Sequence, residues 1–167
     1  MIWKPNVTVA SIVELNGKFL MVEEESPTGP VLNQPAGHLE LSESMADAVV
    51  RETLEETGYR FTPEAVVGCY LWHNGGNETT YYRTTYTGTV CDKVIATELD
   101  KGIIRALWMT YDEILANERR LRSPVIIESL NDYRLGAHYP LSLIKSYFKS
   151  NVANNDVSSS QRKSAVE

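Results

Sequence analysis

Residues 37–59 read GHLELSESMADAVVRETLEETGY, and the pattern of this stretch decides how the rest of the chain is interpreted. It predicts an α-helix over residues 43–57 that ends at Gly58, since glycine readily adopts the left-handed conformation found just past a helix C-terminus. Ser42 is the expected N-cap, because a serine side chain can accept a hydrogen bond from the first turn. One side of the helix carries small and apolar residues at helical spacing and can pack on a sheet. These residues are Ala46, Val50, Thr53 and Thr57.

The other side of this helix is acidic. Glu52, Glu55 and Glu56 stand at positions i, i+3 and i+4, so their Cβ atoms share one face at separations of about 5–6 Å. Like charges at this spacing repel one another, and they crowd the end of the helix where the macrodipole is already negative. A solvated acidic face is one interpretation. The other is a site for a hard divalent cation such as Mg²⁺, which prefers carboxylate and carbonyl oxygens. The helical geometry alone leaves both open.

The composition is that of one globular domain, with 167 residues of which 43% are apolar and 23% charged. Its 16 Lys and Arg residues against 22 Asp and Glu give a formal net charge of −6. This charge argues against a nucleic-acid polymer or an anionic membrane surface as partner, since both require a basic face. A protein this acidic needs a metal ion or a few local Arg and Lys residues to bind a phosphate group.

The sequence predicts a cytoplasmic location. No stretch approaches the roughly 18 apolar residues that a spanning helix needs, and the N-terminus lacks the unbroken apolar core of a signal peptide. The two cysteines, Cys69 and Cys91, do not make a disulfide framework and are predicted to be small buried apolar residues.

The rest of the chain predicts a mixed sheet with few helices, an α/β or α+β domain. Strands are expected at residues 8–14, 18–22, 31–35, 65–73, 79–91 and 103–109, and further helices at residues 111–117, 124–134 and 140–149. Residues 1–149 are predicted to form the domain. Residues 150–167 are rich in Asn, Ser, Gln and scattered charge, and they are predicted to be a disordered tail.

The spacing within residues 37–59 resembles the Nudix box of the Nudix hydrolases. Gly37 is followed after five residues by Glu43, after seven by Arg51-Glu52, after two by Glu55-Glu56 and after one by Gly58. Thr53 and Tyr59 depart from the pattern, because Ile, Leu or Val is usual at both positions, and this puts the local packing in doubt.

The likeness extends over about residues 3–148. Residues 4–10, 33–40 and 121–124, with the pairs 128–129 and 139–140, resemble the bacterial phosphatase NudJ subgroup of the family. Its members cleave nucleoside tri- and diphosphates and the thiamine precursor hydroxymethylpyrimidine diphosphate. The resemblance implies a Nudix fold, an α/β/α sandwich with a mixed central sheet, and a small phosphorylated molecule as substrate.

Site roles follow from the same resemblance. It implies that Glu52, Glu55 and Glu56, with the carbonyl of Gly37, bind Mg²⁺, for which Mn²⁺ could substitute. It also implies an ion pair between Arg51 and Glu43, and the residues themselves assign Arg51 to orienting the ligands, since it lies off the metal face. The general base is either a carboxylate of this cluster or a loop acid, for which the candidates are Glu98 and Asp100.

Substrate-binding candidates lie outside the box, each with a structural alternative. Arg83 could hold a phosphate or be an exposed strand residue, and Trp72 could stack on a base or belong to the core. Gln34, with Asn33, could face the pocket or close a turn. Ser123, with Arg122, could reach substrate, although capping the following helix is the favoured interpretation.

Three other functions compete with a phosphatase acting on nucleoside tri- and diphosphates. Two are enzymes, an oxidised-nucleotide pyrophosphatase and a pyrophosphatase for ADP-ribose or dinucleotides. The third is a non-catalytic Nudix-fold ligand sensor, against which the three intact glutamates count.

Overall fold

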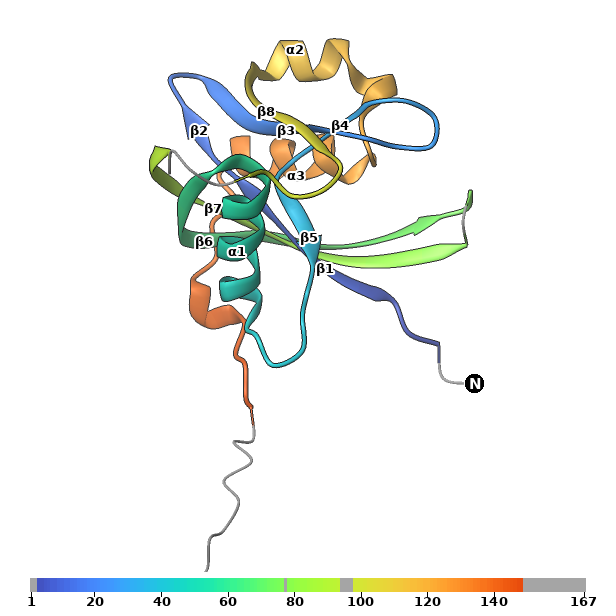
Figure 1. Cartoon of the computed structure of the whole chain (residues 1–167). Helices are drawn as coiled ribbons and strands as arrows, with labels where there is room; N and C mark the ends of the chain where they lie inside the picture. The colour runs from blue at the N-terminus through green and yellow to red at the C-terminus, as the bar shows by residue number, and fades with distance from the viewer. Residues whose placement is uncertain (1–2, 77, 94–97, 149–167) are drawn as a thin grey trace, which may run out of the picture.

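The computed structural model describes residues 3–76, 78–93 and 98–148. Strands dominate the first two thirds of the chain, and three α-helices accompany them (Figure 1). The strands are β1 (Asn6–Ile12), β2 (Glu14–Leu15), β3 (Lys18–Glu24), β4 (Val31–Asn33), β5 (Ala36–His38), β6 (Tyr59–Asn74), β7 (Thr79–Lys93) and β8 (Ile103–Thr110). The helices are α1 (Met45–Thr57), α2 (Tyr111–Ala116) and α3 (Val125–Arg134), with 3₁₀ turns η1 (Glu118–Arg120) and η2 (Leu141–Leu143).

The strands form two sheets. The first has the order β5-β1-β7-β6 and is mixed, since β1 runs parallel to β7 while the other neighbours are antiparallel. The second contains β2, β3 and β4, with β8 paired along β3. The predicted hairpin of two long strands is confirmed as β6–β7, although β6 already begins at Tyr59 and residue 77 of the expected turn lies outside the described residues.

Helices cover both faces of this strand layer, which confirms the predicted sandwich. Successive strand residues point to opposite faces, and Val66 and Val67 of β6 accordingly enter different clusters. Val66 packs in the cluster that contains Val49 of α1, whereas Val67 packs in the cluster that contains Leu130 of α3. The acidic helix is therefore held against one face of the sheets, and α3 closes the other.

Helix α1 begins at Met45, two residues later than predicted. Its N-cap is Ser44, whose hydroxyl accepts a hydrogen bond from Asp47 N–H, whereas Ser42 adopts a left-handed conformation with φ 68°. The expected C-terminal residue is confirmed, since Gly58 has φ 74° and its N–H donates to the carbonyl of Leu54. The helix thus ends where its glycine permits a left-handed residue.

The buried side of α1 centres on Ala48 and Val49 rather than on Ala46 and Val50. Thr53 is fully buried there and its hydroxyl lies 2.9 Å from that of Ser11 in β1, while it also donates to the carbonyl of Val49. Its departure from the usual aliphatic residue is therefore accommodated by a buried hydroxyl pair. Tyr59, the other departure, lies edge-on to the ring of Trp108, with ring centroids 5.9 Å apart.

Two further sequence predictions are wrong. The helix predicted at residues 140–149 is not formed in its described part: residues 140–148 contain only η2, and the chain joins β6 through a backbone bridge between Tyr139 and Val66. Cys69 and Cys91 are exposed rather than buried, since each lies on a section of the β6–β7 hairpin where alternate side chains face outward. The predicted tail, residues 150–167, lies outside the described residues.

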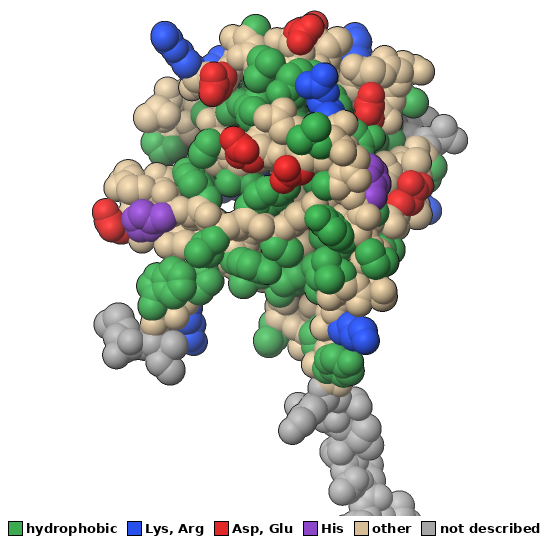
Figure 2. Space-filling model, turned by 180° about the vertical axis from the view of Figure 1, so that it is seen from behind, with side chains coloured by type: hydrophobic (Ala, Val, Ile, Leu, Met, Phe, Trp, Pro, Cys, Tyr) green, Lys and Arg blue, Asp and Glu red, His purple; other side chains and the backbone are tan. Residues whose placement is uncertain are grey.

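The surface carries no broad basic face in the view of Figure 2. Lys and Arg side chains are scattered singly there among acidic and apolar ones, in keeping with the net charge of −6. Among the helices of the described residues, none has the length and apolar character required to span a bilayer.

Removing one buried hydroxyl should stabilise the fold. Thr85 of β7 is fully buried and its Oγ1 lacks a hydrogen-bond partner among the described residues. An unsatisfied buried hydroxyl costs about 1–3 kcal/mol, so Thr85→Val should raise the free energy of unfolding by about 1 kcal/mol in urea denaturation. Thr87→Val is the matched control, because Thr87 on the same strand donates to the carbonyl of Ile12 at 3.1 Å. Equal losses of stability in both variants would contradict the assignment.

Candidate active site

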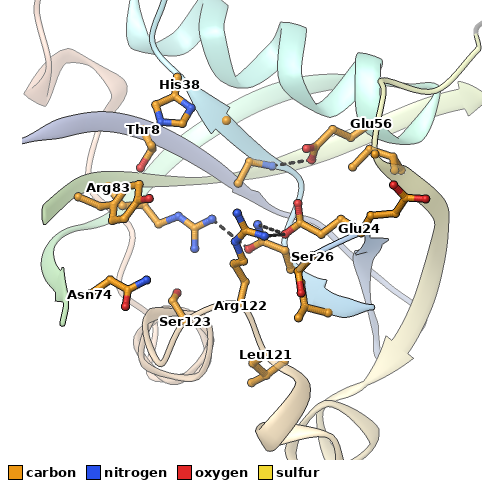
Figure 3. Close-up of a pocket in the computed structure, with 18 of the residues that line it drawn as sticks. Thr8, Glu24, Ser26, His38, Glu56, Asn74, Arg83, Leu121, Arg122 and Ser123 are labelled. Carbon is orange, nitrogen blue, oxygen red and sulfur yellow. Dashed lines mark hydrogen bonds and ion pairs between the residues drawn. The ribbon is translucent and has the colours of Figure 1, made fainter. Parts of the chain in front are cut away.

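A cavity of about 900 Å³ opens between the C-terminal half of α1, strands β5 and β7, and the loop that precedes α3 (Figure 3). Its walls come from segments far apart in the chain. Nine residues named as site candidates line it: Asn33, Gly37, Glu52, Glu56, Trp72, Arg83, Asp100, Arg122 and Ser123. The fold therefore brings together most of the residues that the sequence singled out.

Glu56 is the most deeply placed of the three glutamates and is only 6% exposed. Its Oε2 accepts a hydrogen bond from the backbone N–H of Ala36 in β5 at 2.8 Å. Burial raises the pKa of Glu56 to about 8, and the nearby carboxylates of Glu24 and Glu52 add to this effect. A buried carboxylate beside two others is unfavourable unless a positive charge compensates it.

Glu52 lies directly against Gly37. A Cβ atom placed on Gly37 would come within 2.1–2.2 Å of the carboxyl atoms of Glu52. Only a residue without a side chain therefore lets this carboxylate rest on the β5 backbone. Burial raises the pKa of Glu52, and the ion pair with Arg51 partly opposes that shift.

Arg51 links the parts of the stretch 37–59. Its guanidinium binds Glu43 through two hydrogen bonds of 2.7 and 3.1 Å and donates to the carbonyl of His38 at 3.0 Å. The same group reaches Glu52 at 2.8 Å and Glu55 at 3.0 Å. The ion pair expected between Arg51 and Glu43 is present, and these contacts orient two carboxylates of α1 relative to β5.

The donor chemistry of this cluster suits a hard divalent cation. Within residues 3–76, 78–93 and 98–148 no three His, Cys, Asp or Glu side chains stand ready around a common metal position. Glu52 and Glu55 are instead turned toward Arg51, and Glu55 is 45% exposed. Each of these two contacts engages one carboxylate oxygen, so a rotation away from Arg51 would make oxygens available beside Glu56. Mg²⁺ prefers oxygen ligands, which the carboxylates and the carbonyl of Gly37 can supply.

The two loop acids differ in position. Asp100 lines the cavity, its N–H donates to the carbonyl of Glu55 at 2.9 Å, and its charge is close enough to raise the pKa of Glu52. Glu98 is exposed and is not among the residues that line the cavity. Of the two candidates for a loop base, the structure brings only Asp100 to the site.

An aromatic pair lies on the hairpin side of the cavity. The rings of Trp72 on β6 and Tyr81 on β7 are stacked, with centroids 5.6 Å apart and an angle of 20° between their planes. Both residues line the cavity. Trp72 is therefore not a core residue, and its partner Tyr81 was not predicted from the sequence.

Arg83 is buried rather than exposed, with 8% of its surface accessible, and it lines the cavity. Its Nη2 donates to Oδ1 of Asn33 at 3.1 Å, and Nδ2 of Asn33 donates to Glu24 at 3.1 Å. The sequence did not single out Glu24, although a run of three glutamates at the end of β3 was a signal that could have found it.

Gln34 does not line the cavity. It is 1% exposed, and its Nε2 donates to Oγ of Ser129 at 3.1 Å, so it ties the β4–β5 connection to α3. Ser123, in contrast to Gln34, lines the cavity. Helix α3 begins without a side-chain cap, so Ser123 does not cap it. The favoured prediction of a capping serine is therefore wrong.

Comparisons with known proteins show the family of the chain. A family profile for the NUDIX domain matches residues 3–130. The phosphatase NudJ of Escherichia coli strain K12 is 37% identical over 143 residues, which cover 85% of this chain and 92% of that protein. A solved NUDIX hydrolase from Nitrosomonas europaea is 46% identical, with a TM-score of 0.84 over 86% of this chain and 98% of the other. The E. coli ORF135 protein, 22% identical with a TM-score of 0.62 over 79% of this chain and 90% of its own, shares the fold. The chain therefore belongs to the Nudix hydrolases, enzymes that act on pyrophosphate bonds.

Proposed function

We propose that this protein uses Mg²⁺ to hydrolyse phosphoanhydride bonds of nucleoside tri- and diphosphates, releasing one terminal phosphate at a time. The observation that carries the proposal is the layout of the cavity. Its lining includes Glu52 and Glu56 of the acidic cluster and the buried arginine Arg83. It also includes the stacked rings of Trp72 and Tyr81. A nucleotide offers the matching parts, namely phosphates for a cation and an arginine, and a flat base for an aromatic surface.

The residues of the chain have separate tasks in this reaction. Arg51 orients Glu52 and Glu55, and the N–H of Ala36 orients Glu56. When bound, Mg²⁺ would screen the phosphate oxygens and activate a water molecule. Asp100 or a carboxylate of the cluster would accept the proton of that water.

Release of single phosphates is the choice supported by the phosphatase name of the E. coli relative. A smaller diphosphate with one heterocyclic ring, such as hydroxymethylpyrimidine diphosphate, presents the same chemical parts to the cavity and belongs to the same proposal. The cytoplasmic location stays a prediction from the sequence.

A substrate panel tests the proposal. Purified protein is incubated with nucleoside tri- and diphosphates, oxidised nucleotides, ADP-ribose and dinucleotides, with Mg²⁺ or with excess EDTA. We expect orthophosphate from nucleoside tri- and diphosphates, only with Mg²⁺. Release of nucleoside monophosphate plus pyrophosphate would instead indicate an oxidised-nucleotide pyrophosphatase. Cleavage of ADP-ribose alone would indicate a pyrophosphatase for ADP-ribose or dinucleotides. Equal inactivity of the wild type and Glu55→Gln on every compound would favour a ligand sensor.

A further inference from the structure

Arg83 is a buried cation to which no carboxylate of the described residues is hydrogen-bonded. Its described hydrogen bond goes to Asn33 Oδ1, a neutral acceptor, whereas a guanidinium carries several N–H donors. Burial lowers the pKa of Arg83 to about 10, although the charges of Glu56 and Glu24 oppose that shift. The group therefore lies near the acidic cluster but still bears a desolvation cost.

The other nitrogens of Arg83 face the cavity. Among the described residues, no nitrogen of Arg83 is both fully buried and without a hydrogen-bond partner. Oγ1 of Thr85 is the atom among these residues in that condition. Nitrogens of Arg83 that make no hydrogen bond must therefore be open to the cavity that this residue lines. Figure 3 shows its guanidinium pointing into that space.

A second arginine enters the same cavity from the loop before α3. The Nη1 of Arg122 lies 3.8 Å from Oε1 of Glu24, a long ion pair, and the side chain is half exposed. Figure 3 shows Arg122 rising toward the middle of the cavity, the region to which Arg83 also points. The charge of Arg122 contributes to lowering the pKa of Arg83, so the two guanidinium groups repel each other.

Glu24 compensates this pair only in part. Its Oε1 accepts a hydrogen bond from Asn33 Nδ2, and Asn33 in turn accepts one from Arg83. Glu24 thus contacts Arg83 through an intervening amide and Arg122 only at long range. It is a positioning residue that holds both arginines while leaving their donors unsaturated.

We propose that Arg83 and Arg122 together bind a phosphate group of the substrate next to the one attacked at the acidic cluster. Two guanidinium groups that share one cavity suit the several oxygens of a phosphate, each able to accept a charge-assisted hydrogen bond. The assignment rests on the proposed function. It deepens that proposal by predicting that the smallest compound to bind well has two linked phosphates.

We call Arg83 and Arg122 together the arginine clamp. Ligand binding tests the clamp without hydrolysis. The probe is α,β-methylene-ADP, whose bridging carbon resists cleavage, titrated with Mg²⁺ into the wild type and variants by calorimetry. Losing one charge-assisted hydrogen bond weakens binding about 10-fold or more, so Arg83→Gln and Arg122→Gln should each raise the Kd by that factor. Arg60→Gln is the matched control, since Arg60 is exposed on β6 and does not line the cavity. It should leave the Kd unchanged.

AMP provides a second measurement. The wild type should bind α,β-methylene-ADP more tightly than AMP, and Arg122→Gln should reduce this difference. Because Arg122 is half exposed, its variant will fold even if Arg83→Gln does not. Arg83→Lys, which keeps the charge but not the forked donors, should recover only part of the affinity.

Failure of the clamp and failure of the proposed function give different results. Suppose that the wild type hydrolyses ADP, and that Arg122→Gln changes neither the KM for ADP nor the Kd for the methylene analogue. This result would overturn the clamp and leave the function standing. Wild-type protein that binds the analogue through both arginines but releases no phosphate from any nucleotide would overturn the function and support the clamp.

Discussion

Glu56→Gln is expected to lower kcat by about 10²–10³-fold in the presence of Mg²⁺, the range seen when one preorganised electrostatic group is removed from an active site. The amide has the shape of the carboxyl group, and its oxygen can still accept the hydrogen bond from Ala36 N–H. The variant lacks the negative charge that a cation would bind. Because burial already disfavours that charge, the neutral side chain should not lower the melting temperature.

The control for Glu56→Gln is Glu64→Gln. Glu64 is an exposed carboxylate on β6 whose described contact is a hydrogen bond from Thr89, which an amide oxygen also accepts. This variant should retain wild-type kcat. Full activity of a folded Glu56→Gln protein would show that the cluster does not hold the catalytic cation.

Gly37→Ala should lower kcat by about 10- to 100-fold, the usual cost of displacing a metal ligand from its orientation. The added methyl group would occupy the position of the Glu52 carboxyl group, at 2.1–2.2 Å from its atoms. Those atoms end a flexible side chain, so the carboxylate moves and the backbone does not have to. We therefore expect a folded protein with weaker Mg²⁺ binding, measured as a higher Mg²⁺ concentration for half-maximal activity.

Gly75→Ala is the matched substitution for this test. Beyond its two chain neighbours, no atom of the described residues lies within 4 Å of a Cβ placed on Gly75, and its φ is not positive, so the change meets neither a clash nor strain there. Its activity and Mg²⁺ requirement should equal those of the wild type. If Gly37→Ala behaved in the same way, the contact between Gly37 and Glu52 would have no part in the reaction.

Local sequence rules predicted the acidic cluster because the helical period alone places Glu52, Glu55 and Glu56 on one face. Which of them is buried was beyond such rules. Glu56 is covered because β5 passes beside α1 and supplies the N–H of Ala36, a contact between residues 20 positions apart. Glu55 stays 45% exposed, and among the described residues its side chain is held by the ion pair with Arg51.

Residues that depend on distant pairing were the least predictable. The hydrogen bond between Arg83 and Asn33 spans 50 positions, and that between Gln34 and Ser129 spans 95. Both Asn33 and Gln34 are buried, and the sequence pattern does not tell which of the two faces the cavity. The helix predicted at residues 140–149 failed for a related reason, since the backbone bridge between Tyr139 and Val66 sets the path of the chain there.

The most direct test is the position of a bound cation. Crystals of the protein grown with Mn²⁺, at a concentration that supports hydrolysis, can be measured at the manganese absorption edge. We predict an anomalous peak between the carboxylates of Glu52, Glu55 and Glu56 and the carbonyl of Gly37, with Arg51 released from at least one of its glutamates. An active protein whose crystals show no manganese at this cluster would contradict the account.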